Sequence, residues 1–234
     1  METMTQHKSR QASPITQGVT VRSATPADAG VLARLDYEAT LPLLNRSFYE
    51  DLLAKTGTSV LPFLEAVFRY GLSRWGTAED FILLEVNGSV AAGCAVYKPV
   101  SAAPGTGPLS LEKLSDVAKA LNWQQSQIDA FTSAHQQMWQ AIGEVLLPQA
   151  DCIVEAVAVL PGWRGRGLGH QLMVAAKQRA QVLGAETLGI MVIHGNDAAA
   201  HLYGQYFHPY ISYHADFFDH QFSGLTKFRT RLSA

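Results

Sequence analysis

Two spacings of apolar residues alternate along the chain, and together they predict a mixed α+β fold. Short apolar or alternating runs predict strands at 19–22, 81–86, 89–97, 152–160, 188–194, 210–218 and 226–232. Apolar residues three and four apart predict helices at 46–55, 62–74, 111–146, 167–183 and 198–206, and one that begins at Thr25 and is interrupted at Pro42. Asn87-Gly88 predicts a hairpin between two of the strands, because both residues tolerate positive φ.

The length of 234 residues indicates one large domain or one domain with an insertion. We expect residues 1–17 to be a flexible tail and residues 18–234 to form a single domain. A long helical block at about 102–148 is expected to be an insertion that packs on this domain. A lid over a binding site and a homodimer contact are the alternatives for it. Hydrophobic residues make up 47% of the chain, enough for a sizeable core.

Charge and cysteine content exclude several classes of protein. Lys plus Arg total 18 and Asp plus Glu total 20, so the basic excess typical of nucleic-acid binding is missing. Apolar runs fall short of the ~18 residues that a membrane span needs. Cys94 and Cys152 are the only cysteines, too few for a disulfide framework or a sequence-local zinc site. We therefore expect a cytoplasmic protein without metal, membrane or nucleic-acid partners.

The segment with the clearest chemical pattern follows the strand at 152–160. The strand ends at Pro161, and a turn with three alternating glycines leads into a helix: Arg164, Gly165, Arg166, Gly167, Leu168, Gly169 and His170. Free backbone amides at a helix start, together with the helix dipole, form an anion site, and glycines allow phosphate oxygens to approach closely. The Lys-Ser/Thr of a Walker loop is absent. His170 takes the sixth position of a dinucleotide fingerprint, which disfavours a nucleotide-dependent oxidoreductase.

Two motifs in this region resemble the GNAT superfamily of acyl-CoA-dependent N-acyltransferases. The first is Arg164-Gly-Arg-Gly167-Leu-Gly169 after Ala-Val-x-Pro, and the second is Asn196-x-x-Ala199-x-x-Leu202-Tyr203. The resemblance extends from about residue 19 to 232, the insertion excepted. It implies a three-layer α/β/α fold of the α+β class, in which a mixed, mostly antiparallel sheet has a splayed central strand pair. The chain departs from the family at Phe207-His208, where Gly-Phe is common.

The resemblance also implies roles for individual residues. Acetyl-CoA is the implied cosubstrate. Its pyrophosphate is expected on the backbone amides of residues 165–170, next to the positive charges of Arg164 and Arg166. The backbone of Val157 and Val159 is expected to pair with the pantetheine arm. Asn196 is expected to hold the coenzyme near the cleft, and Tyr203 to act as general acid beside the sulfur.

The nucleophile needs help, because an amine of pKa ~10.4 is mostly protonated at neutral pH. Glu155 is the first candidate base, since strand parity puts it on the same face as Val157 and Val159 in a regular strand. A bulge, which is common here in the family, would change that facing. His194, at the end of the next strand, is the second candidate because it titrates near neutral pH.

These observations predict an N-acetyltransferase that transfers an acetyl group from acetyl-CoA directly to a primary amine. The acceptor is a small molecule or a peptide, with some early aromatic residues lining its pocket. The alternative is a non-catalytic acyl-CoA-binding or sensing module that keeps the coenzyme site without a working base.

Overall fold

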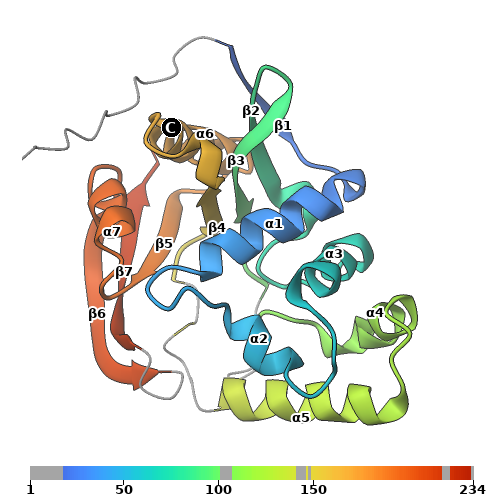
Figure 1. Ribbon diagram of the computed structural model, residues 1–234. Coiled ribbons are helices and arrows are strands. Elements are labelled where there is room, and N and C mark those ends of the chain that lie inside the picture. Colours follow the sequence, from blue (N-terminus) through green and yellow to red (C-terminus); the bar gives the residue numbers. More distant parts are fainter. Residues whose placement is uncertain (1–17, 101–106, 141–145, 147–148, 218–221, 233–234) are drawn as a thin grey trace, which may run out of the picture.

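The computed structural model describes residues 18–100, 107–140, 146, 149–217 and 222–232. The expected tail, residues 1–17, and the part of the insertion at 102–106, 141–145 and 147–148 lie outside these ranges. The described strands form one seven-stranded sheet in the order β1-β2-β3-β4-β5-β7-β6 (Figure 1). The strands are β1 (Val19–Ser23), β2 (Phe81–Val86), β3 (Ser89–Tyr97), β4 (Cys152–Val159), β5 (Thr187–Ile193), β6 (His208–Phe217) and β7 (Phe222–Arg231).

Helices cover both faces of the sheet and make a three-layer molecule, as the sequence predicts. One face carries α6 and α7, whose apolar residues share a core with β2 to β5. The other face carries α1, and α3 packs on α1. The described helices are α1 (Ala29–Thr40), α2 (Phe48–Leu53), α3 (Val60–Tyr70), α4 (Leu114–Ala120), α5 (Gln125–Gln140), α6 (Leu168–Val182) and α7 (Asp197–Gly204). None of them is long and apolar enough to cross a membrane.

Strands β4 and β5 are splayed, in agreement with the expected architecture. They are the parallel pair of the sheet, and they pair only at Cys152–Leu188 and Ile153–Gly189. Beyond these two pairs the strands diverge, so the edge of β4 that faces β5 loses its backbone partner. The same strand remains paired with β3 along its other edge.

A bulge in β4 changes which residues face which layer. Ala95 pairs with Glu155 and Gly93 pairs with Ala158, so β4 has one more residue than β3 between these two pairs. Ala156 takes up the extra residue with a φ of 51°, in the left-handed region. Glu155 then faces α1, whereas Val157 packs with the α6 core. The shared face expected for Glu155, Val157 and Val159 is therefore wrong, because it assumed an unbroken strand.

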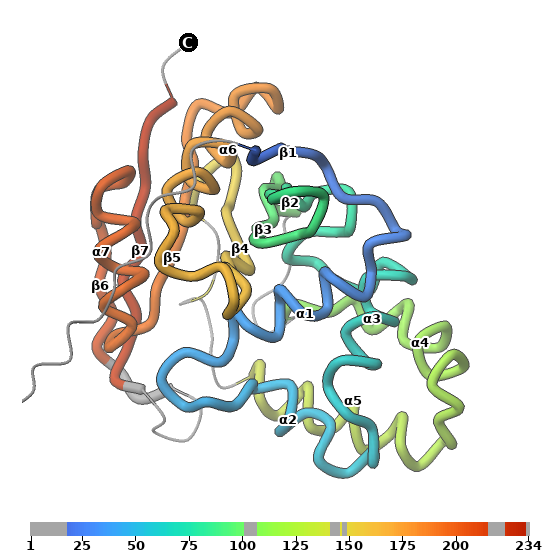
Figure 2. The backbone as a smooth tube through the Cα atoms, turned by 45° about the horizontal axis from the view of Figure 1, so that its top comes forward, coloured from blue at the N-terminus to red at the C-terminus, as the bar shows by residue number. Residues whose placement is uncertain are grey.

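The described part of the insertion packs on the domain through a cluster of aromatic rings. Trp123 stacks on Phe63 of α3, with ring centroids 6.0 Å apart and an interplanar angle of 4°. Phe131 of α5 joins the same cluster. Helices α2 and α5 lie side by side in both views (Figure 1; Figure 2). The single helical block expected over 111–146 is broken between α4 and α5, where Asn122 has a φ of 54°.

Candidate active site

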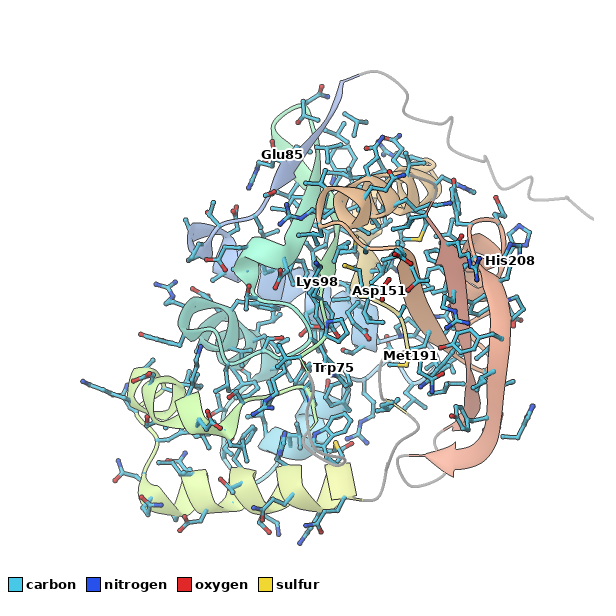
Figure 3. All side chains as sticks on the ribbon, turned by 180° about the vertical axis from the view of Figure 1, so that it is seen from behind. Trp75, Glu85, Lys98, Asp151, Met191 and His208 are labelled. Carbon is cyan, nitrogen blue, oxygen red and sulfur yellow. The ribbon has the colours of Figure 1, made fainter. Side chains whose placement is uncertain are left out.

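A cavity of about 250 Å³ lies at the splay between β4 and β5. Its walls come from α1, α2, α5, α7 and both strands, together with the loop that joins α1 to α2. Trp75 and Met191, which both line it, lie near one another in the middle of the molecule when it is seen from behind (Figure 3). Of the residues that the structure describes, five aromatic ones contribute to the walls: Phe48, Tyr49, Trp75, Trp139 and Tyr203.

Two carboxyl groups share this cavity. Burial, and then the charge of Asp36, raise the pKa of Glu155 to about 8, although the backbone amide of Ala156 donates to the Glu155 carboxylate and opposes the shift. Burial also raises the pKa of Asp36 to about 7, opposed by a hydrogen bond from the Tyr49 hydroxyl. A base with a pKa close to the working pH is well matched to proton transfer. Asp36 could not be identified from the sequence, because no local sequence pattern distinguishes a functional acidic residue in an amphipathic helix from a solvent-exposed one.

Tyr203 of α7 reaches the cavity from the opposite side of the sheet. Its ring belongs to the core that α6 and α7 share, and it meets Phe228 edge-on at 6.4 Å. Burial, and then the charge of Glu155, raise the pKa of Tyr203 well above its usual value. The hydroxyl therefore keeps its proton and can donate it. Glu155 faces the α1 layer and Tyr203 the α7 layer, and the gap between β4 and β5 lets both line one cavity.

His194 points away from this arrangement. Its Nε2 lies 3.1 Å from both the Ser212 hydroxyl of β6 and the Thr226 hydroxyl of β7. Its ring is 4.9 Å from the His214 ring, and His194 is not among the residues that line the cavity. The structure therefore brings Glu155 and Tyr203 together and leaves His194 on the β6–β7 side.

The glycine-rich turn lies between β4 and α6. Gly165 and Gly167 have φ values of 74° and 79°, which glycine adopts without steric cost. The first hydrogen bonds of α6 run from the amides of His170 and Gln171 to the Gly167 carbonyl. The amides of Leu168 and Gly169 open the helix without an intrahelical acceptor. A Cβ at Gly165 would meet nothing within 4 Å, so the backbone is accessible there.

Gly169 has a second reason to be glycine. A Cβ at this position would lie 3.0 Å from the side chain of Leu202, tighter than an ordinary contact. The absence of a side chain allows α6 and α7 to approach each other. A substitution at Gly169 therefore disturbs helix packing as well as any anion site.

The side chains around the turn hold it in place. The guanidinium of Arg164 bonds Glu38 of α1 at 2.8 Å and the Val159 carbonyl at 3.0 Å. Arg166 lies over the Trp163 ring, 5.1 Å from its centroid. The Nδ1 atom of His170 is 3.1 Å from the Tyr206 hydroxyl. Arg164 thus anchors the turn on α1, a role beyond the positive charge that the sequence suggests.

Asn196 and the free edge of β4 border the cavity. The Oδ1 atom of Asn196 accepts from the Ala199 amide at 3.3 Å and caps α7, and Asn196 and Val157 both line the cavity. A smaller cavity of about 20 Å³ adjoins it and is lined by Glu155 and Lys227, among others. Burial lowers the pKa of Lys227 to about 8. Within the described ranges, no three His, Cys, Asp or Glu side chains gather as they would around a metal ion.

Known proteins resemble the chain in fold and, over part of its length, in sequence. Residues 120–208 match the model of the acetyltransferase (GNAT) family, a range that includes the glycine-rich turn and α7. No curated protein matches the chain. Among solved structures, an N-acetyltransferase from Staphylococcus aureus Mu50 aligns with a TM-score of 0.57 at 15% identity, covering 90% of this chain and 100% of its own.

Two further structures show the same fold. A protein solved as an acetyltransferase aligns with a TM-score of 0.53 at 18% identity, covering 92% of this chain and 100% of its own. A Salmonella typhimurium protein described as an acetyltransferase, and solved with its cofactor acetyl-CoA, aligns with a TM-score of 0.51 at 16% identity. It covers 93% of this chain and 95% of its own.

Proposed function

We propose that the chain is a GNAT-superfamily acetyltransferase that transfers the acetyl group of acetyl-CoA directly to a primary amine. The observation that carries the proposal is the pairing of Glu155 and Tyr203 in one cavity from opposite faces of the sheet. One group is suited to take a proton and the other to give one. A single-step transfer needs both at the same place.

The chain's own residues fit the coenzyme. The exposed backbone of Gly165 and the start of α6 suit its pyrophosphate, and the unpaired edge of β4 at Val157 and Val159 suits its extended amide arm. Arg166 and His170 flank the same turn. When bound, the coenzyme supplies an activated acetyl group as a thioester.

The reaction balances with these two side chains. Glu155 takes one proton from the ammonium form of the amine and releases it to solvent, and it then accepts a second proton from the nitrogen as that atom bonds to the acetyl carbonyl carbon. Tyr203 donates its proton to the sulfur as the carbon–sulfur bond breaks, and Glu155 returns its proton to Tyr203 through solvent. The products are the N-acetylated amine and free coenzyme A. Since a thiol of pKa ~8.5 leaves fairly well, the base contributes more than the acid.

A thermal-shift titration tests the coenzyme half of the proposal. Acetyl-CoA at a hundred times its Kd should stabilise the fold by about 2.7 kcal/mol and raise Tm by about 5–10 °C. NADP and ATP should not match that shift at equal concentration. Stabilisation by NADP and not by acetyl-CoA would refute the proposal.

A matched pair of glycine variants locates the site. Gly165 and Gly184 have φ values of 74° and 70°, a Cβ at either meets nothing within 4 Å, and they lie at opposite ends of α6. Gly165→Asn should weaken acetyl-CoA binding, whereas Gly184→Asn should leave it unchanged. The conformational strain of a non-glycine residue is similar at the two positions, so a difference in binding reports the location of the site. Equal binding by the two variants would remove the turn from the coenzyme site.

Turnover separates the enzyme from a non-catalytic acyl-CoA-binding module. The enzyme releases free thiol from acetyl-CoA faster when an amine is added, and the release depends on Glu155. A binding module gives the thermal shift without thiol release. The presence of both a poised carboxyl and a buried tyrosine in the cavity favours the enzyme.

A further inference from the structure

The cavity also points to the kind of amine, an inference that rests on the proposed function. We propose that the acceptor is a compact monoamine with an apolar, aromatic body. Its ammonium lies against the carboxyl groups of Asp36 and Glu155, and its body packs on the rings of Phe48, Trp75 and Trp139. Charge, shape and size each support this assignment.

The charged side chains that line the cavity favour a cation. Among the residues that the structure describes, they are Asp36, Glu155 and Arg46. Arg46 forms an ion pair with Asp51, and its Nε lies 3.8 Å from Glu50. Its positive charge is thus balanced by two carboxylates outside the lining, while Asp36 and Glu155 face the space. When ionised, the carboxylates of Asp36 and Glu155 each attract an ammonium group and repel an acceptor that carries its own carboxylate.

Part of the cavity wall is aromatic. The Trp139 ring meets the Phe48 ring edge-on at 5.7 Å and the Trp75 ring edge-on at 5.6 Å. The three rings come from α2, from the segment before β2 and from α5, and all of them line the cavity. A continuous ring surface binds an apolar or aromatic body, and its faces also attract a cation. Through Trp139, the insertion contributes to the acceptor wall.

The size of the cavity limits the acceptor. Its 250 Å³ corresponds to about eight water molecules at liquid density and lies below the usual 300–1,000 Å³ of ligand pockets. Part of this space must hold the acetyl group. A small arylalkylamine fits such a space.

Lys227 does not supply a binding site for an acceptor carboxylate. It lines the adjoining cavity of about 20 Å³, which has room for about one water molecule. A carboxylate could reach it only if the walls moved apart. The comparison between an amine and its amino acid therefore tests the charge argument directly.

A panel of four acceptors with acetyl-CoA tests each argument separately. Relative to 2-phenylethylamine, phenylalanine adds a carboxylate, ethylamine removes the ring and spermidine adds charges without a ring. We expect kcat/KM for 2-phenylethylamine to exceed that for each of the others by about tenfold or more, the value of one charged or aromatic contact. Phenylalanine or spermidine as an equal or better substrate overturns the inference.

Variants locate the selectivity. Asp36→Asn should raise KM for 2-phenylethylamine by about 10-fold or more, because the ammonium loses an attracting carboxylate. The same variant should lower the ratio of kcat/KM for 2-phenylethylamine to that for phenylalanine, because the phenylalanine carboxylate is repelled less. Trp139→Phe should narrow the preference over ethylamine. Asp116→Asn removes an exposed carboxylate on α4 and should change neither ratio. A purely structural role for Asp36 would leave the amine-to-amino-acid ratio unchanged, and that result also overturns the inference.

The two proposals fail in different ways. If the protein acetylates other amines but not 2-phenylethylamine, the proposed acceptor class is wrong and the proposed acetyltransferase activity stands. A thermal shift with acetyl-CoA but no turnover of 2-phenylethylamine also overturns the acceptor class. Absence of both the thermal shift and any turnover refutes the proposed function itself.

Discussion

Asp36 of α1 and Glu155 of the β4 bulge line the same cavity, and the charge of Asp36 raises the pKa of Glu155. The two groups come from distant parts of the sequence and from different layers of the fold. Their proximity means that the proton affinity of the candidate base depends on a neighbour that does not need to react. Tyr49 in turn hydrogen-bonds Asp36 and favours its charged form.

The pH dependence of kcat/KM should reflect the ionisation of Asp36 and Glu155. We expect kcat/KM of the wild type to rise with pH and level off above about pH 8, the pKa of Glu155. Glu155→Gln should lose most activity near neutral pH and recover as the pH approaches the amine pKa of ~10.4, because free amine becomes abundant. Steady-state rates from pH 6 to 10 measure both effects.

Asp36→Asn provides the matched comparison. Removing the neighbouring charge lowers the pKa of Glu155, so the rising limb should move to lower pH while the shape of the curve is kept. A Glu155→Gln variant that loses the same factor at every pH would make Glu155 an orienting group. Proton removal would then go through ordered water, because His194 lies outside the cavity.

Stability should fall as the pH rises through the same range. Glu155 has a pKa of about 8 in the fold and 4.5 as a free side chain, and Asp36 has about 7 and 3.8. Between these limits the native state binds more protons than the unfolded chain, so the free energy of unfolding declines with increasing pH. Thermal unfolding at pH 5 and pH 8.5 measures this change.

Replacing one of these carboxyl groups by an amide should remove part of the decline in the free energy of unfolding with increasing pH. Glu155→Gln should raise Tm at pH 8.5, by about 2–4 °C for each kcal/mol regained, and have little effect at pH 4.5. Asp116→Asn on the surface of α4 should not change the pH dependence. A Glu155→Gln variant that is destabilised equally at both pH values would contradict the buried, proton-holding state of this carboxyl.

Tyr203→Phe should lower kcat by about 10–100-fold, at or below the lower end of general-acid effects, because a thiolate leaves without much assistance. The ring keeps its edge-on contact with Phe228, so Tm should change little. Tyr70→Phe, on an exposed residue of α3, is the control. Unaltered kcat in Tyr203→Phe would show that the thiolate is protonated by another group or by water.

Arg164 and Glu38 should behave as a coupled pair. Arg164→Ala leaves the buried carboxylate of Glu38 with Arg34 as its remaining ion-pair partner, which should lower stability and weaken coenzyme binding in a salt-dependent way. A double-mutant cycle with Glu38→Gln should give a coupling free energy of about 0.5–3 kcal/mol. Additive effects would mean that the contact contributes nothing.

Local patterns in the sequence predict much of the fold. The hairpin over β2 and β3 has the expected bounds, and Asn87 and Gly88 both have positive φ. The glycine-rich turn leads into α6 within a residue of the expected start, because the helix signals there are local. Helix α3 ends at Tyr70 and not at Arg74, since the left-handed Gly71 closes it earlier.

The site itself depends on contacts that no local pattern encodes. Alanine is an ordinary strand residue, so nothing at Ala156 predicts a left-handed φ or the facing of Glu155. Asp36 and Trp139 meet the cavity only because α1 and α5 pack as they do. Tyr203 could be named from the sequence through the family resemblance, and Glu155 from a strand parity that the bulge at Ala156 overturns, but their shared cavity required the splayed strands.

Helix α1 contributes to both of the proposed substrate sites. Glu38 holds the turn that suits the coenzyme, and Asp36, half a turn away on the same helix, lines the acceptor cavity. Any coupling free energy between the two sites through this helix must be reciprocal. The factor by which coenzyme loading changes the Kd of the amine is then equal to the factor by which the amine changes the Kd of the coenzyme. A substitution at Glu38, well outside the acceptor cavity, should alter both factors together.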